Sequence, residues 1–128
     1  MVDHRRFLER ERVRAAIVRA ESGTSAPIAV VVASRVKGSV QEAALRELHR
    51  RGLHAPQRNA VLFYVVPSRR EFAVVGDSGA HEAFGQETWN ALAATVERGL
   101  RGSDPTDALV KGIEEAGAHL ARHFPREG

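Results

Sequence analysis

The spacing of apolar residues changes from the period of a helix to that of a strand within the first third of the chain. Residues 3–21 lack proline and glycine, and Val13, Ala16 and Ile17 fall on one helical face. The run Ile28–Val32 is rich in β-branched side chains and is short for a helix. The pattern therefore predicts a helix over residues 3–21 and a buried strand within residues 27–36.

A second helix is predicted from a capping pattern. Ser39 and Glu42 have the spacing at which a serine caps the start of a helix and a glutamate reaches back to it. The helix should end at Gly52, because glycine is common where the chain leaves a helix. Three of its apolar side chains are expected to face the core: Ala44, Leu45 and Leu48.

Two further strands are predicted to form a hairpin. Residues 60–66 are apolar throughout, which is typical of a strand that is covered on both faces. Pro67–Arg70 is short enough to be a turn into a strand over residues 72–75. Two strands joined this tightly are antiparallel.

The rest of the chain is predicted to be helical. A short helical turn over residues 80–84 precedes a helix over about residues 86–101, in which Trp89, Leu92 and Val96 share one face. Asp104 and Pro105 are the residue types favoured at the cap and first position of a helix. That last helix should end before residue 125.

Together these elements predict an α/β fold, a three-layer α/β/α sandwich with a small mixed sheet. A strand–helix–strand crossover is almost always right-handed and leaves its two strands parallel. The sheet should therefore combine a parallel pair with the antiparallel hairpin and carry helices on both faces. At 128 residues, the whole chain 1–128 fits a single domain.

The predicted topology brings polar residues from three segments to one edge of the sheet. Asn59 precedes the second strand, and Asp77 follows the third, which runs the opposite way. Thr24 and Ser25 precede the first strand, which is parallel to the second. These four side chains are expected at the same edge.

Composition narrows the classes of function. The chain has no cysteine, which excludes disulfides, thiolate metal sites and cysteine nucleophiles. Its formal net charge is only +3, and acidic residues are interleaved with the arginines of the first helix, so no nucleic-acid partner is expected. The start lacks the apolar core of a signal peptide, and no apolar run reaches the roughly 20 residues of a membrane span. We therefore expect a soluble, cytoplasmic protein without a transmembrane segment.

Asp77 has a structural and a functional interpretation. A glycine-bounded aspartate after a strand can simply cap the helical turn that follows it. Alternatively, its carboxylate, with Asn59 and the hydroxyl of Thr24 or Ser25, supplies the oxygen ligands that calcium or magnesium prefers. The backbone amides of the same turn can also form an anion-binding nest, which makes four residues candidates for phosphate binding: Gly76, Ser78, Gly79 and, through its guanidinium, Arg58.

The histidines offer weaker candidates. His81 and Glu82 lie beside Asp77 and have the residue types of an acid/base pair, although solvated residues on an exposed turn are the more common case. His119 and His123 are four residues apart, a spacing that suits a transition metal. Favourable interaction with the carbonyl end of their helix is the preferred explanation.

The segments 59–65 and 70–82 together resemble the central hairpin of the TPM domain family, which is named for a thylakoid-lumen phosphatase. The resemblance extends over nearly the whole chain and is strongest to the short soluble bacterial members. It implies an α/β/α sandwich, divalent-cation binding in some members and acid phosphatase activity in the plastid branch. By the family's hairpin motif it implicates Asn59, Asp77 and Glu82. Short members are often encoded near LemA-type membrane proteins, so the resemblance also implies a protein partner at a membrane.

The chain departs from the family pattern next to Ser25. Where the family commonly has glycine and glutamate, this chain has Ala26 and Pro27, so a carboxylate is missing from the edge. Two functions remain as hypotheses. The preferred one is a noncatalytic module that binds a divalent cation, calcium or magnesium, or a partner. The alternative is a weak metal-assisted acid phosphatase acting on phosphate monoesters, with metal-bound water as nucleophile.

Overall fold

The chain forms a three-stranded sheet with helices on both faces. The structure is a computed structural model that describes residues 8–51 and 55–126. The strands are β1 (Ile28–Val32), β2 (Val61–Val66) and β3 (Glu71–Gly76), in the spatial order β1-β2-β3. β1 is parallel to β2, and β2 is antiparallel to β3. The predicted mixed sheet is therefore confirmed.

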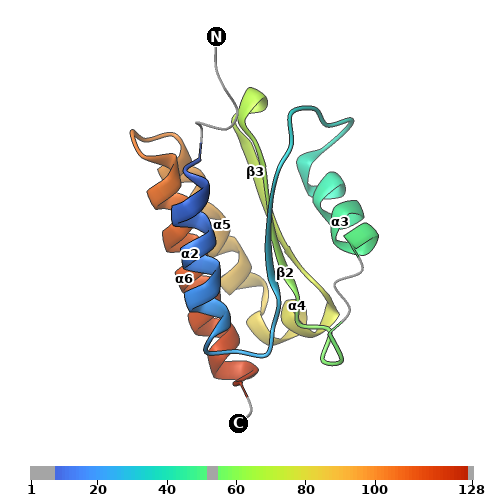
Figure 1. Cartoon of the computed structure of the whole chain (residues 1–128). Coiled ribbons are helices and arrows are strands. Elements are labelled where there is room, and N and C mark those ends of the chain that lie inside the picture. The colour runs from blue at the N-terminus through green and yellow to red at the C-terminus, as the bar shows by residue number, and fades with distance from the viewer. Residues whose placement is uncertain (1–7, 52–54, 127–128) are drawn as a thin grey trace.

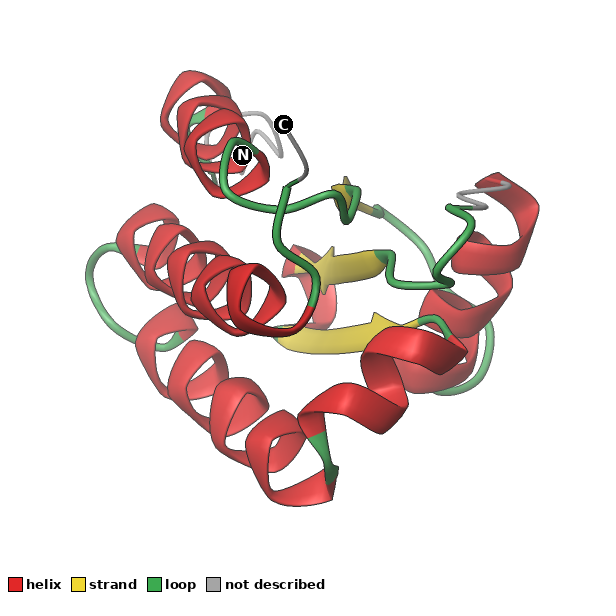
Figure 2. Cartoon of the chain, turned by 90° about the horizontal axis from the view of Figure 1, so that it is seen from below, coloured by secondary structure: helices red, strands yellow, loops and turns green. Residues whose placement is uncertain are grey.

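The helices divide unequally between the two faces (Figures 1 and 2). The layer on one face contains α2 (Arg10–Glu21), α5 (Gln86–Leu100) and α6 (Pro105–His123), and α6 packs against both of the others. α3 (Val40–Arg51) is the one helix of the described residues that covers the other face. The short helix α4 (Ser78–Phe84) follows β3 at the lower end of the sheet in Figure 1. This arrangement is the predicted three-layer sandwich.

β2 shows why an unbroken apolar run forms a central strand. Its side chains alternate between two separate clusters: Val61, Phe63 and Val65 pack with the layer of three helices, whereas Leu62, Tyr64 and Val66 pack with α3. Every residue of β2 is buried. Because neighbouring side chains of a strand point to opposite faces, both faces must be apolar when both are covered.

Local signals set several boundaries as the sequence predicts. Ser39 Oγ accepts the backbone N–H of Glu42 at 3.1 Å, and Asp104 Oδ1 accepts that of Asp107 at 3.0 Å, so both predicted caps are present. The hairpin turn is a short 3-10 helix, Pro67–Arg69, after which Arg70 adopts a left-handed conformation with φ 51°.

Two predictions of burial are wrong. β1 lies at the edge of the sheet, and only Ile28 is buried there, while Val32 is 41% exposed. A β-branched run identifies a strand, but it does not show how much of that strand the helices cover. Leu45 was expected in the core and is 39% exposed, because α3 turns Ala44 and Leu48 to the sheet instead.

Within the described part of the predicted first helix, α2 begins at Arg10. Glu9 is extended, and its N–H donates to Thr106 Oγ1 at 2.9 Å, which ties the start of α2 to α6. Residues 3–7 of this predicted helix lie outside the described residues. Gly52, the predicted end of the second helix, also lies outside them.

Candidate functional site

Polar residues from three segments lie just beyond the strand ends at one end of the sheet, the lower end in Figure 1. The register pairs Ile28 with Val61 and Val61 with Gly76, so the residues just outside the strands are neighbours as well. These include Ser25, Asn59 and Asp77, which together with Gln57 we call the polar edge. The strand register thus brings Ser25, Asn59 and Asp77 to the same end of the sheet, as the strand order and directions predicted from the sequence require.

Asn59 is the most unusual residue of the polar edge. It is only 1% exposed, and its Nδ2 donates to Ser25 Oγ at 3.2 Å. Ser25 Oγ in turn donates to Gln57 Oε1 at 3.0 Å. The buried Oδ1 of Asn59 has no hydrogen-bond partner among the described residues. A buried acceptor left unsatisfied costs about 1–3 kcal/mol, so this atom is a favourable place for a donor or a cation.

Asp77 is the N-cap of α4, as its structural interpretation predicted. Its Oδ1 accepts the N–H of Ser78 at 2.7 Å, and its backbone carbonyl accepts the N–H of His81 at 2.8 Å. The other carboxylate oxygen lies 3.9 Å from Nε of Arg58, a long ion pair. Arg58 has a left-handed backbone with φ 54°, and its side chain is 55% exposed against 16% for Asp77. The carboxylate is therefore partly shielded and only loosely neutralised.

The amides around Asp77 are used within the protein. The N–H of Asp77 donates to the Ala60 carbonyl at 2.9 Å, and those of Gly79 and Ala80 donate to the Arg58 carbonyl at 2.8 and 3.2 Å. With the Ser78 amide held by Asp77, these four successive donors are all engaged. The turn is thus not an open anion-binding nest. The backbone amides of Ser78 and Gly79, which the sequence suggested as phosphate ligands, already donate to protein oxygens.

The flanking glycines have packing reasons. A Cβ on Gly76 would lie 2.7 Å from the ring of Trp89, which packs under the end of β3. A Cβ on Gly79 would overlap the Gln57 carbonyl and lie 2.9 Å from that of Arg58. Gly79 therefore lets α4 approach the loop that carries Arg58 and Asn59.

Glu82 and His81 do not join the polar edge. Both are exposed on α4, and no described hydrogen bond or ion pair links Glu82 to Asp77 or Asn59. Five positions separate Glu82 from Asp77, which corresponds to about 140° around a helix axis. Glu82 therefore faces a different direction from the capping carboxylate.

The aromatic and histidine residues nearby form a packing cluster. Phe84 stacks on Trp89 with ring centroids 4.6 Å apart, and Trp89 Nε1 donates to the His81 carbonyl at 3.1 Å. His119 and His123 lie against Phe84 at 5.3 and 6.4 Å. Within residues 8–51 and 55–126, no group of three or more histidine, aspartate or glutamate side chains gathers to hold a metal.

Thr24, which was expected to share the edge with Ser25, has a structural role. It is buried, and its Oγ1 lies within hydrogen-bond distance of the Phe124 and Leu120 carbonyls. Thr24 also forms an isolated bridge with Pro125. This residue fastens the end of α6 to the start of β1.

Two residues at or near the polar edge were not predicted from the sequence. Gln57 accepts the Ser25 hydroxyl, and Glu21 accepts the Ile28 N–H through Oε2 at 2.9 Å. Glu21 also lines a surface pocket with Ser25. The carboxylate of Glu21, at the end of α2, thus lies near Ala26 and Pro27, where this chain lacks the glutamate common in the family pattern. No spacing rule identifies Glu21, because the loop over residues 22–27 decides where its side chain ends.

Comparison with known proteins gives a consistent result. The family model of the TPM domain matches residues 1–119. The NMR structure of the BA42 protein from Bizionia argentinensis is 28% identical, with a TM-score of 0.86 over 99% of this chain and 90% of that one. The N-terminal domain of cg2496 from Corynebacterium glutamicum is 17% identical, with a TM-score of 0.68 over 86% of this chain and 70% of that one. An N-terminal domain from P. gingivalis is 15% identical, with a TM-score of 0.74 over 96% and 84%. No curated protein sequence matches the chain.

Among the described residues, none of the helices combines the length and apolarity needed to cross a bilayer.

Proposed function

The chain belongs to the TPM domain family, and from that membership and the geometry of the polar edge we propose that it is a noncatalytic domain that binds a divalent cation. The cation is calcium or magnesium, and its ligands are Asp77, Asn59 and Ser25. All three offer the hard oxygen atoms that these ions prefer.

The unpartnered Oδ1 of Asn59 is the observation that carries this proposal. Folding has placed a buried acceptor next to the strand end that bears Asp77, and nothing in the described protein donates to it. A cation would satisfy this oxygen and the partly shielded carboxylate together. Because Oδ1 is buried, binding of a cation requires a small movement of the residues that cover it.

The charge of the site limits its affinity. The site contributes one carboxylate, that of Asp77. The guanidinium of Arg58 lies 3.9 Å from this carboxylate, and its positive charge repels a bound cation. Sites with few charged ligands bind calcium with dissociation constants on the order of 10⁻³ M. We therefore expect weak binding, with calcium preferred to magnesium because the larger ion tolerates irregular ligand geometry.

Phosphatase activity receives less support from the same geometry. Metal-assisted phosphoryl transfer needs groups that neutralise several phosphate oxygens. The amides of Asp77, Ser78, Gly79 and Ala80 all donate to protein oxygens. Arg58 is then the remaining candidate for phosphate, and it already lies beside Asp77.

Isothermal titration calorimetry of the protein with calcium and with magnesium tests the proposal. We expect saturable heat with calcium that Asp77→Asn abolishes. Asparagine is as good an N-cap as aspartate, so this variant keeps the start of α4 and removes only the charge. Calcium at about ten times its dissociation constant should raise the unfolding free energy by about 1.4 kcal/mol, seen as a higher Tm.

Two further variants sharpen the experiment. Arg58→Ala should increase calcium affinity several-fold, because it removes a positive charge near the site. If the site instead binds phosphate, the same variant should bind phosphate more weakly, because it loses the guanidinium. Asp104→Asn changes another N-cap aspartate, on α6 at the opposite end of the molecule in Figure 1, and should leave calcium binding unchanged. Absence of saturable heat with either ion, or equal heat in Asp77→Asn, would contradict the proposed site.

A further inference from the structure

The outer edge of β1 carries backbone groups that the sheet does not use. Val61 N–H donates to the Pro27 carbonyl at 3.0 Å, and Ala33 N–H donates to the Val65 carbonyl at 2.9 Å. Alternate residues of a strand direct their backbone groups to the same side. The backbone polar groups of the odd-numbered residues 27–33 therefore point toward β2. Those of Ile28, Val30 and Val32 point away from β2, to the outer edge of the sheet.

Only the first of these outward positions has a partner among the described residues. The N–H of Ile28 donates to Glu21 Oε2 at 2.9 Å. No described hydrogen bond is made by the backbone N–H of Val30 or of Val32. An unpaired strand edge is a template for another strand, and proteins usually cover or charge it. Within residues 8–51 and 55–126, no strand pairs with this edge over the second half of β1.

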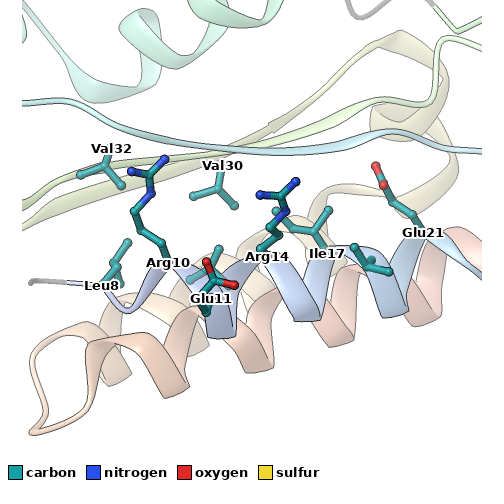
Figure 3. A pocket seen from close by; sticks show the side chains of 10 residues that line it. Leu8, Arg10, Glu11, Arg14, Ile17, Glu21, Val30 and Val32 are labelled. Carbon is teal, nitrogen blue, oxygen red and sulfur yellow. The ribbon is translucent and has the colours of Figure 1, made fainter. Parts of the chain in front are cut away.

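An apolar groove runs along this edge between β1 and α2 (Figure 3). Leu8, Ile17 and Val30 line it, and the partly exposed Val32 and Val18 lie at 41% and 62% exposure. Val30 and Val32 are less buried than Ile28. We call this groove and the open half of β1 the β1 edge site.

Two arginines of α2 give the site its charge. Figure 3 shows the guanidinium groups of Arg10 and Arg14 directed from α2 toward β1, beside Val32 and Val30. Neither arginine forms an ion pair with another described residue. Glu11 lies between the two arginines along α2, and Glu21 lies at the far end of the groove, so the half where the backbone edge is open carries two arginines and one glutamate and keeps a net positive charge.

The spacing of the arginines matches an added strand. Residues four apart on a helix are about 6 Å apart along its axis. Side chains at alternate positions of a strand, which point to the same face, are about 6.6–6.8 Å apart. Two carboxylates at alternate positions of a strand beside β1 would therefore reach Arg10 and Arg14 together.

We propose that the β1 edge site binds an extended acidic segment of a partner protein as a fourth strand of the sheet. The backbone groups of Val30 and Val32 pair with the segment, and Arg10 and Arg14 bind carboxylates at alternate positions on it. The stems of those acidic side chains cover the apolar groove. This surface is separate from the polar edge and does not depend on cation binding there.

Charge argues against a second copy of the chain as the occupant. Symmetric pairing of two β1 edges about a two-fold axis normal to the sheet would place both α2 helices on the same face. Arg10 and Arg14 of each copy would then approach those of the other. Like charges in such proximity disfavour association, whereas an acidic strand relieves the positive charge.

The test uses the whole protein and a fluorescein-labelled eight-residue peptide of alternating valine and glutamate. Fluorescence anisotropy should show saturable binding, and a peptide with lysine in place of glutamate should bind at least about tenfold more weakly. The double variant Arg10→Glu and Arg14→Glu should reduce affinity for the glutamate peptide at least about tenfold. Arg98→Glu, an exposed charge reversal on α5, is the matched control and should have no effect.

A backbone variant separates strand addition from simple charge attraction. Val30→Pro removes an outward N–H and leaves the bonds to β2, since proline is tolerated on an edge strand when its nitrogen faces outward. We expect it to weaken peptide binding while circular dichroism and Tm report a folded protein. If it does not fold, the arginine variants alone decide.

Three results would overturn the proposal. The first is equal binding of the glutamate and lysine peptides, and the second is unchanged affinity in the double arginine variant. The third is a dimer in sedimentation experiments that Arg10→Glu and Arg14→Glu leave intact and that the peptide fails to dissociate, because a second copy would then occupy the edge.

Discussion

At the residue scale, Gly79 permits a close backbone contact beside the candidate site because it has no side chain. Its N–H donates to the Arg58 carbonyl at 2.8 Å, and its missing Cβ leaves room for the Gln57 carbonyl. The residues that follow Gln57 include Asn59. The close contact at Gly79 therefore helps to fix where the buried Oδ1 of Asn59 lies.

Gly79→Ala should destabilise the protein by about 1–3 kcal/mol, the usual cost of forcing an extra carbon into a packed region. Alanine normally favours a helix, so the expected loss arises from the clash with two backbone carbonyls. The measurement is the free energy of unfolding in urea. Gly23→Ala is the control, because its Cβ would lie 3.7 Å from Ala121, an ordinary contact. Equal effects of the two substitutions would contradict this explanation.

At the scale of elements, the start of α6 is stabilised by charge as well as by capping. The backbone N–H of Asp107 donates to Asp104 and lowers the pKa of this carboxyl, and the nearby Arg12 lowers it further. Arg12 also pairs with Glu9 at 2.7 Å, and the hydrogen bond to Glu9 raises the pKa of the guanidinium. These contacts join the first turn of α2 to the first turn of α6.

The lowered pKa of Asp104 predicts a pH dependence. A carboxyl whose pKa is lower in the folded state stabilises the fold above its unfolded pKa, and this contribution disappears as the pH falls through the folded value. Asp104→Asn should keep the cap, and its Tm should therefore decrease less steeply than that of the wild type under acidic conditions. Asp104→Ala should have a lower Tm at neutral pH as well, because it also loses the cap.

Thermal unfolding followed by circular dichroism from acid to neutral pH checks this prediction. Glu97→Gln, an exposed carboxylate on α5, serves as the matched control and should leave the slope unchanged. Parallel Tm curves for the wild type and Asp104→Asn would show that Asp104 does not contribute to acid unfolding.

At the scale of the whole molecule, the two faces of the sheet are covered unequally. Three helices pack on one face, and their cluster includes Phe63, Leu109 and Ile113, all fully buried. On the other face, α3 is the one described helix that packs on Leu62 and Tyr64. The smaller cluster buries less apolar surface, so α3 is held to the sheet by less free energy than α6.

Hydrogen exchange should reflect this difference. We expect amides of β2 and the middle of α6 to exchange last, and those of α3 to exchange earlier through local opening. Mass spectrometry of peptic fragments measures both regions in one experiment. Exchange of α3 and α6 at the same rate would indicate that the molecule opens only as a single cooperative unit.

Sequence patterns predicted the elements well where a local cause exists. The caps at Ser39 and Asp104 and the apolar run of β2 follow from interactions within a few residues or from the periodicity of a strand. The burial of Leu45 and β1 was predicted wrongly, because it depends on which neighbouring element covers a given side chain. Neither periodicity nor propensity contains that information.

The polar edge was predictable only in part. Strand order and direction were enough to gather Ser25, Asn59 and Asp77 at one end of the sheet. The orientation of Thr24 toward α6, the separation of Glu82 from Asp77 and the approach of Glu21 to Ile28 were not. Each of these depends on the path of a loop or on the angle around a helix.

The sequence by itself determined that this chain forms an α/β/α sandwich with a mixed sheet, because apolar periodicity and short connections leave few ways to bury the strands. Only the tertiary structure decided what the polar residues do. Among the described residues, it left Asn59 Oδ1 and the outer N–H groups of Val30 and Val32 without a hydrogen-bond partner, and it engaged the backbone amides of residues 77–80 with protein oxygens. Hydrogen bonds between distant segments depend on distances of a few tenths of an ångström, and these are fixed only when all the layers pack together.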